Sequence, residues 1–442
     1  MRLSNFLPLI AIQCYLILTL VIFSNGPISY HVEYPLLFWG FMASYQFALI
    51  LGYLIGARVN FNMVEYPALQ DQMSLFSVKV IVCLAVVASI MSMKQFSLYD
   101  IFNPYFLYNA VLDGLTNPGE QYTNKMLGVG ESVSNKAFNF LLFLFAFTKI
   151  VCIPVIVLNW SRMSGLLRIV SLFATLLPVI SAISNGTNKS VFDFFIYYFA
   201  SLASVFVYNK VRFGTFRLAD YKFFTLLIPL SLIGALAFFG ATIGQRGGSV
   251  AYLIDISPLG HISLVDYSKN FDEYGFIWYV YTWFSNYLVQ GYYGFSLSLS
   301  YDFNSTFGLG NSVFLMRQFE FLTGVDLSIL TYQHKIGEYW GEFAQWHSFY
   351  AHFANDFHFG GVTLVSLLLG YFIARVWIRF IVYSDLISYL FLPLIMLLVI
   401  FIPANNQVFS LLDTFSTFVV LFLAWCFKDK GFISKRIKYV HG

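Results

Sequence analysis

The chain of 442 residues is 59% hydrophobic, 20% aromatic and only 11% charged, with a formal net charge of +3. In soluble domains about a quarter of the residues are charged, so a mean hydropathy of +0.71 excludes an ordinary soluble protein. The charges are also too few and too dispersed for the basic face that nucleic-acid binding requires. We therefore expect an integral membrane protein with a single membrane domain over residues 1–442.

Ten apolar stretches are long enough, at about 20 residues, to cross a bilayer as helices. In chain order they cover residues 6–23, 35–57, 75–93, 137–158, 166–184, 191–208, 222–243, 360–383, 386–402 and 410–427. Two long loops, residues 94–136 and 244–359, separate some of these spans. The predicted fold is an all-α polytopic membrane protein with about ten transmembrane helices.

Parts of the two long loops are expected to lie in the membrane interface. Residues 98–115 combine aromatic side chains with Asp100 and Asp113 at helical spacing, which suits a helix lying on the surface. Residues 276–299 are long enough to cross the bilayer, but they contain Gln290 and many Tyr and Trp residues. This composition is typical of the interface, so we exclude the segment as a further span.

The orientation follows from Lys and Arg, which favour cytoplasmic loops. If the ten spans alternate, both termini and the short basic loops, including the one with Arg375 and Arg379, fall on one side. The two long loops are sparse in basic residues and fall on the other side. We therefore expect both termini in the cytoplasm and the long loops outside it.

The densest group of titratable residues lies at the end of the second long loop. Residues 334–358 contain four of the seven histidines together with Glu338, Glu342 and Asp356. On a single helix these carboxylates would share one face with His352. His352 and Asp356, four residues apart, could then form a hydrogen bond in which the carboxylate orients the imidazole as a general base.

Two other interpretations of this group stay open. The residues could be solvated loop residues at the outer surface, particularly since Gly337 and Gly341 weaken the assumption of one continuous helix. His and carboxylate side chains at four-residue spacing can also bind zinc. Because the sequence has no H-E-x-x-H arrangement, we predict no metal site.

Three cationic side chains in outer segments could bind an anion. The turn 184–190 precedes a span that runs inward, so its backbone N–H groups and the helix dipole favour phosphate, and Lys189 adds a full charge. Arg246 lies among glycines that let a ligand approach, and its guanidinium matches phosphate oxygens in pairs. Arg317 is a further candidate. The alternatives are a helix cap with a snorkelling lysine, and lipid head groups or Glu320 as partners of the arginines.

Lys149 lies near the middle of the span 137–158. A charge at this depth costs about 3 kcal/mol on insertion scales. Lys149 therefore needs a partner or a wet cavity, unless its side chain snorkels toward the cytoplasmic interface.

With these motifs in place, the chain resembles the bacterial O-antigen polymerases, the Wzy-type polymerases of oligosaccharide repeat units. The resemblance covers the whole topology. Its most specific segments are residues 185–189 (NGTNK), 287–294 (YLVQGYYG), 307–312 (FGLGNS) and 355–361 (NDFHFGG). Many members have arginine where this chain has Lys189, and lack His358 within the aspartate–aromatic–glycine segment.

The resemblance implies a metal-independent glycosyltransferase of the bacterial inner membrane, related in architecture to GT-C-type enzymes, with its active site in the periplasm. It would join undecaprenyl-diphosphate-linked oligosaccharides without a cofactor, and a chain-length regulator protein is a candidate partner. The sequence contains no P-loop or G-x-G-x-x-G motif, in line with a lipid diphosphate donor. The diphosphate would be held by Arg246, Lys189 and Arg317.

The same resemblance assigns the remaining candidate residues. His352, oriented by Asp356, would remove the proton of the acceptor hydroxyl, with Glu342 and Glu338 in reserve. Four aromatic residues could stack on sugar rings or anchor the chain in the interface: Tyr292, Tyr293, Trp340 and Trp346.

Two rival functions share much of this evidence. An O-antigen ligase uses the same donor and differs in its acceptor. A flippase for lipid-linked oligosaccharides should place its ionisable residues near the bilayer midplane, in broken helices and paired repeats. In this sequence most charge gathers in outer loops, which favours an enzyme.

Overall fold

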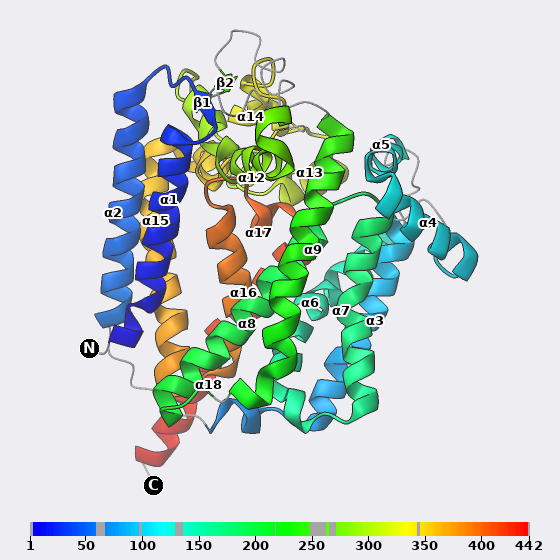
Figure 1. Cartoon of the computed structure of the whole chain (residues 1–442). Helices are drawn as coiled ribbons and strands as arrows, with labels where there is room; N and C mark the ends of the chain where they lie inside the picture. Colours follow the sequence, from blue (N-terminus) through cyan, green and yellow to red (C-terminus); the bar gives the residue numbers. More distant parts are fainter. Residues whose placement is uncertain are drawn as a thin grey trace.

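The computed structural model describes residues 3–58, 67–96, 100–128, 136–216, 218–247, 262–264, 271–342 and 345–440. Most of these residues form long helices, and many of these run in roughly one direction, whereas α8 (Lys189–Phe213) is inclined to it (Figure 1). They are α1 (Leu7–Asn25), α2 (Pro35–Arg58), α3 (Leu75–Phe96), α6 (Lys136–Asn159), α7 (Gly165–Ser184), α8 (Lys189–Phe213), α9 (Lys222–Gly247), α15 (Phe349–Tyr383), α16 (Leu386–Phe401) and α18 (Leu412–Val440). Both chain termini lie at one end of this bundle, the terminal end, and the opposite end is the loop end (Figure 1).

Within the described residues, eight helices are long and apolar enough to cross a membrane by length and composition. They are α1, α2, α3, α6, α7, α8, α9 and α15, and they correspond to eight of the ten predicted spans. Of the other two, α16 is a shorter apolar helix of 16 residues, and α18 continues into the basic C-terminal segment. The protein is therefore an all-α polytopic membrane protein, as predicted.

Short elements close the two ends of the bundle. The 3₁₀ helices η1 (Leu3–Asn5), η2 (Leu69–Gln72), η3 (Trp160–Arg162) and η4 (Leu218–Tyr221) lie in the connections of the terminal end. The loop end holds α4 (Pro104–Thr116), α5 (Pro118–Gly128), α12 (Phe271–Ser298), α13 (Val313–Thr323), η5 (Ser328–Leu330), α14 (Tyr332–Lys335) and, deeper in the bundle, α17 (Gln407–Ser410). A small antiparallel sheet, which the prediction did not include, pairs β1 (Ile28–Tyr30) with β2 (Ile262–Leu264).

The two segments predicted to lie in the interface contain helices that are not among the eight candidate spans. α4 begins where the Asn103 side chain accepts a hydrogen bond from the backbone N–H of Tyr105, with Pro104 as its first residue. It projects sideways from the bundle at the loop end (Figure 1). α12, which contains most of residues 276–299, is not among the eight candidate spans and lies across the bundle direction.

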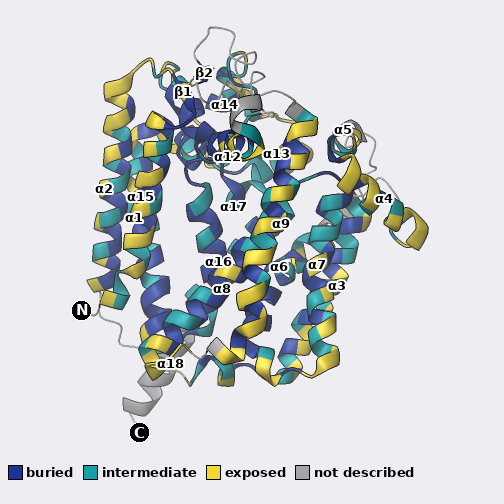
Figure 2. Ribbon diagram, in the orientation of Figure 1, coloured by how far each residue is buried: buried dark blue, intermediate teal, exposed yellow. Residues whose placement is uncertain are grey.

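The outward faces of the peripheral helices are exposed (Figure 2) and carry many large apolar side chains. Large side chains such as Leu36 of α2, Phe76 of α3 and Leu226 of α9 are exposed. Contiguous apolar surface of this kind is rare on soluble monomers and fits contact with lipid. The centre of the bundle is formed by helices whose side chains are mostly buried, α6, α8 and α16.

α2 and α15 pack closely because glycines remove the side chains between them. A Cβ atom on Gly52 would lie 1.9 Å from the carbonyl oxygen of Leu367, and one on Gly370 would lie 2.1 Å from that of Leu49. Gly56 follows Gly52 by one helical turn and meets α15 in the same way. Small residues at this spacing let two membrane helices approach to backbone contact.

We expect Gly52→Val to force α2 away from α15 and to lower the free energy of unfolding by about 3 kcal/mol, because the new side chain meets backbone atoms that cannot move aside. Thermal unfolding of the purified protein in detergent measures the effect. Gly40→Ala in the same helix is the control, because a Cβ there meets nothing within 4 Å. Equal melting temperatures for the Gly52 variant and the wild type would refute this account of the contact.

Arg379 is fully buried, whereas the sequence predicted it as one of the charges of a cytoplasmic loop. It lies near the terminal end of α15, where its guanidinium is 3.3 Å from Asp385 and 4.4 Å from the centre of the Trp425 ring. Asp385 also contacts Lys428 at 2.5 Å and accepts hydrogen bonds from the backbone and side chain of Ser388. The buried carboxylate thus joins α15, α16 and α18.

Candidate functional site

The prediction of one helix over residues 334–358 is wrong. α14 ends at Lys335, and α15 begins at Phe349, where the Ser348 side chain accepts a hydrogen bond from the N–H of Ala351 and caps the helix. The described residues between the two helices form turns. At His358 the backbone has a φ of +58°, which interrupts α15 a second time. The predicted ionisable stripe therefore does not form.

Asp356 does not orient His352, contrary to the prediction. Its carboxylate is surrounded by the loop 306–311, from which it accepts five hydrogen bonds. The donors are the hydroxyl of Thr306 at 2.5 Å, the backbone N–H groups of Gly308, Gly310 and Asn311 at 2.9, 3.1 and 2.8 Å, and the side-chain amide of Asn311 at 2.8 Å. Asp356 therefore holds the loop against α15, which is a structural role.

His352 is buried, with only 5% of its surface exposed, and its Nδ1 has no hydrogen-bond partner in the described structure. Its ring lies 6.5 Å from that of His347, a second buried histidine. Burial, together with the neighbouring His352, lowers the pKa of His347 to about 3. His347 is therefore neutral at physiological pH.

The two glutamates lie near the surface of the loop end. Glu342 is partly buried, and its carboxylate lies 2.9 Å from Nδ1 of His334. Glu338 is exposed. Of the predicted catalytic carboxylates, Glu342 is thus the one with both access to solvent and a histidine partner.

The four predicted sugar-stacking residues differ in burial. Tyr292, Tyr293 and Trp340 are buried in the core, where the hydroxyl of Tyr292 lies 3.1 Å from that of Thr19 and the rings of Tyr293 and Trp340 meet edge to face. No face of these rings is open for stacking in this structure. Trp346 is partly exposed and meets Tyr287 of α12 edge to face at 4.7 Å.

Arg246 ends the membrane-spanning part of α9 and brings three segments together. Its guanidinium donates a hydrogen bond to the carbonyl of Gly186 and lies 3.5 Å above the ring of Tyr122 on α5. Gly186 has a φ of +59°, and a Cβ there would lie 2.0 Å from the carbonyl oxygen of Pro118, so only glycine lets α5 pack on this turn. Gln245 bonds to the backbone of both Thr116 and Gly119, which fixes α5 beside α9.

The same packing places Lys125 of α5 within electrostatic range of Arg246. Burial, and then the positive charge of Arg246, lowers the pKa of Lys125. In the part of the chain that the structure describes, no carboxylate forms an ion pair with either residue. Arg246 and Lys125, the outer cationic pair, therefore carry positive charge that no described carboxylate neutralises, so an anion could bind there. Tyr122 and Lys125 were not predicted, because they lie about 120 residues from Arg246 in the sequence.

The other two predicted anion-binding residues are placed differently. Lys189 follows Gly186 by three residues, but its ammonium forms an ion pair with Asp193 on the next turn of α8. Arg317 is exposed on α13, and no described contact joins it to Arg246 or Lys189. Lys189 thus follows closely on the turn that Arg246 contacts, and no described contact links Arg317 to this turn.

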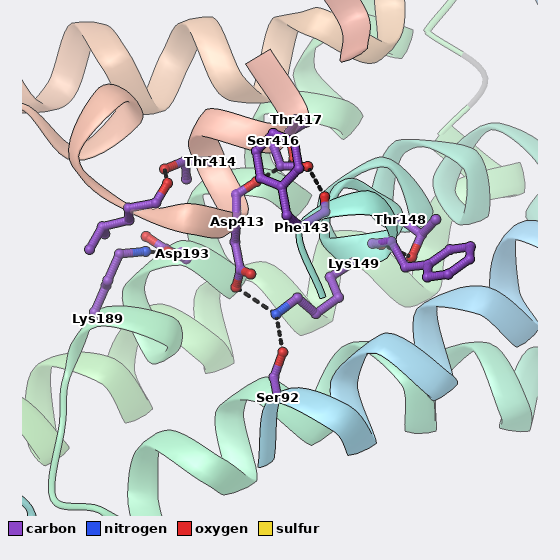
Figure 3. Close-up of polar contacts among 12 residues, drawn as sticks. Ser92, Phe143, Thr148, Lys149, Lys189, Asp193, Asp413, Thr414, Ser416 and Thr417 are labelled. Atoms are coloured by element: carbon purple, nitrogen blue, oxygen red, sulfur yellow. Dashed lines mark hydrogen bonds and ion pairs between the residues drawn. The ribbon is translucent and has the colours of Figure 1, made fainter. Parts of the chain in front are cut away.

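Lys149 has a partner inside the bundle. Its Nζ lies 2.6 Å from the carboxylate of Asp413 on α18 and 2.7 Å from the hydroxyl of Ser92 on α3 (Figure 3). Asp193 lies within electrostatic range of Asp413, so two ion pairs occur close together. Asp193 and Asp413 were missed, although each is an aspartate within a predicted span, which is a signal for function.

No protein-family model, curated protein or solved structure matches this chain. No group of three or more His, Cys, Asp or Glu side chains among the described residues could hold a metal ion. Two features of the described structure could therefore form a functional site. They are the outer cationic pair and the pairs of opposite charge inside the bundle.

Proposed function

We propose that the protein polymerises undecaprenyl-diphosphate-linked oligosaccharide repeat units by glycosyl transfer at the loop end of the bundle, on the periplasmic face of a bacterial inner membrane. The observation that carries the proposal is the outer cationic pair. Arg246 and Lys125 lie within electrostatic range of each other, partly buried and without an ion-paired carboxylate among the described residues, and Arg246 is at the end of a membrane span. A diphosphate attached to a lipid has its charge at this boundary between lipid and water.

The chemistry follows from where the cations lie. The acceptor hydroxyl forms a bond to the anomeric carbon of the donor as the bond from that carbon to the diphosphate oxygen breaks, and the electron pair leaves on the diphosphate. Arg246 and Lys125 would neutralise the charge of this leaving group, which lowers the barrier. A single displacement of this kind inverts the anomeric configuration.

A base must accept the proton of the acceptor hydroxyl. Glu342 supports this role better than His352, because it is partly exposed and hydrogen-bonded to His334 whereas His352 is buried. The Glu342 carboxylate is already accessible to solvent, so the protein need not change conformation to expose it. We therefore assign Glu342 as the base that accepts the proton of the acceptor hydroxyl.

An O-antigen ligase would use the same cationic pair for the same donor. The flippase has one observation in its favour, because Lys149 and Asp413 form an ion pair inside the spans, where a transporter places its charges. Deletion of the gene separates the polymerase from both rivals. Loss of a polymerase leaves lipid A core capped with one repeat unit on gels, whereas loss of a ligase or a flippase leaves uncapped core.

Arg246→Ala is expected to reduce polymer formation by about 100-fold, because the leaving diphosphate loses its bidentate partner. The deletion strain complemented with this variant should show mainly core with a single repeat unit. Arg246→Lys should restore part of the ladder, because it keeps the charge but not the planar fork.

Arg58→Ala is the control, because Arg58 is an exposed arginine at the terminal end of α2. Its lipopolysaccharide ladder should match the wild type. A full ladder from Arg246→Ala at normal protein levels would contradict the proposal. If only Arg317→Ala lost the ladder, the diphosphate site would have to be assigned to α13.

A further inference from the structure

Three polar side chains form a stripe along the first two turns of α8. Lys189, Asp193 and Tyr197 follow one another at intervals of four residues, so they share one face of the helix. Asp193 is only 7% exposed and Tyr197 only 4%. Even so, Oδ1 of Asp193 and the hydroxyl of Tyr197 have no hydrogen-bond partner within the described structure. Buried polar atoms without partners are rare and call for an explanation.

Asp413 faces this stripe from α18. It lies within electrostatic range of both Asp193 and Tyr197, and Figure 3 shows it between Lys149 and the Lys189–Asp193 pair. Lys149 holds one carboxylate oxygen of Asp413 by the 2.6 Å ion pair, and the other oxygen makes no hydrogen bond to a described residue. The Asp413 side chain is 43% exposed although its partner Lys149 is 7% exposed. Asp413 is thus held in place from one side and accessible from the other.

A purely structural role explains these charges poorly. Buried ion pairs contribute little net stability, and apolar side chains of similar size would do as well or better. Here the pairs are also incomplete, because free acceptor oxygens remain on both aspartates. Free acceptor oxygens are suited to a ligand that donates several hydrogen bonds. The two lysines and two aspartates have a combined charge of zero, so they do not favour a charged ligand. A saccharide, with many hydroxyl donors and no required charge, fits this set.

The position of the stripe relates it to the outer cationic pair. Lys189 follows Gly186 by three residues, and the carbonyl of Gly186 accepts the hydrogen bond of Arg246. A ligand whose diphosphate lies at Arg246 and Lys125 therefore has the α8 stripe within reach of its sugars. We propose that Asp193, Tyr197 and Asp413 bind the sugar residues of the lipid-linked substrate, with sugar hydroxyls donating to the free carboxylate oxygens. This assignment rests on the proposed function for the identity of the ligand.

Tyr197→Phe is the most direct test, because it removes a hydroxyl that has no partner in the protein and should leave stability unchanged. The probe is the repeat-unit oligosaccharide released by mild acid from its lipid diphosphate carrier. Calorimetric titration of the full-length protein in nanodiscs measures its Kd. We expect a rise of about 10-fold for Tyr197→Phe, as for one lost hydrogen bond, and about 10- to 100-fold for Asp193→Asn, as for a lost bond to a charged group.

Tyr198→Phe is the matched control, because the Tyr198 hydroxyl lies 3.1 Å from that of Thr175 and outside the stripe. It should lower the melting temperature and leave the Kd unchanged. Wild-type Kd values for both Tyr197→Phe and Asp193→Asn would overturn the assignment. So would a wild-type protein that does not bind the oligosaccharide but gains thermal stability from sodium, lost in Asp193→Asn, because that pattern indicates a cation site.

The two proposals fail in different ways. If Arg246→Ala abolishes the ladder but the stripe variants bind the oligosaccharide normally, the saccharide assignment is wrong and the polymerase proposal stands. If the stripe variants lose binding but deletion of the gene leaves the ladder intact, the saccharide site stands and polymerisation is wrong.

Discussion

Asp385→Asn is expected to lower the free energy of unfolding by about 3–5 kcal/mol, because it removes the buried negative charge that Arg379 and Lys428 both contact. Both Arg379 and Asp385 have no exposed side-chain surface, so solvent cannot replace the lost charge. Unfolding monitored by intrinsic fluorescence in detergent measures the change. Asp71→Asn is the control, because Asp71 is exposed in η2 of the terminal end and should unfold like the wild type.

The same carboxylate predicts a pH dependence. Burial opposes its ionisation, but the charges of Arg379 and Lys428 outweigh burial and hold the pKa of Asp385 below its ordinary value of 3.8. The folded state thus binds the proton less readily than the unfolded state, so the stabilisation is fully present above about pH 4 and is lost as the pH falls through the lowered pKa. The difference in stability between wild type and Asp385→Asn should be constant at neutral pH and shrink in acid. A difference that grows on acidification would refute the assigned ionisation.

Asp356→Ala is expected to have the second large effect, a loss of about 4 kcal/mol. It leaves the donors of the loop 306–311 without their shared acceptor, and bonds to a carboxylate are stronger than those to a neutral group. Asp356→Asn should cost less, because one carbonyl oxygen remains. Thermal unfolding of the purified variants gives both values.

The measurement also separates a structural from a catalytic role for Asp356. In the structural role, the polymer formation that we propose for this protein would fall in proportion to the amount of folded protein. Glu320→Gln is the control, because Glu320 is an exposed acid on α13 near the same loop. An Asp356→Ala variant with the wild-type melting temperature and no polymer would restore the catalytic role that the sequence suggested.

Local patterns in the sequence predicted the architecture well. Spans such as 35–57 and 166–184 match α2 and α7 closely, because about 20 apolar residues in a row form a helix wherever the surroundings are lipid. Residues 276–299 were excluded as a span, and α12, which contains most of them, is not among the eight candidate spans. The helix assumed for residues 334–358 failed at Ser348 and His358, where a cap and a positive φ interrupt it.

The candidate site was predicted only in part. Arg246 and the turn around Gly186 were singled out and do meet, but Lys125 reaches them through α5, which no periodicity connects to α9. Arg379 was predicted to be a charge of a cytoplasmic loop because the sequence shows only that it lies near the end of a span. Its burial depends on Asp385 and Trp425 from two other segments.

The composition and the length of the apolar stretches thus determined that this protein is a helical membrane protein. Each helix forms its backbone hydrogen bonds within itself, and contact with lipid requires only apolar side chains. Which charges meet was decided by the tertiary structure. The pairing of Lys149 with Asp413, and the placement of Lys125 within electrostatic range of Arg246, bring together residues more than a hundred positions apart. Such contacts depend on how helices pack against one another, and no local pattern in the chain records that packing.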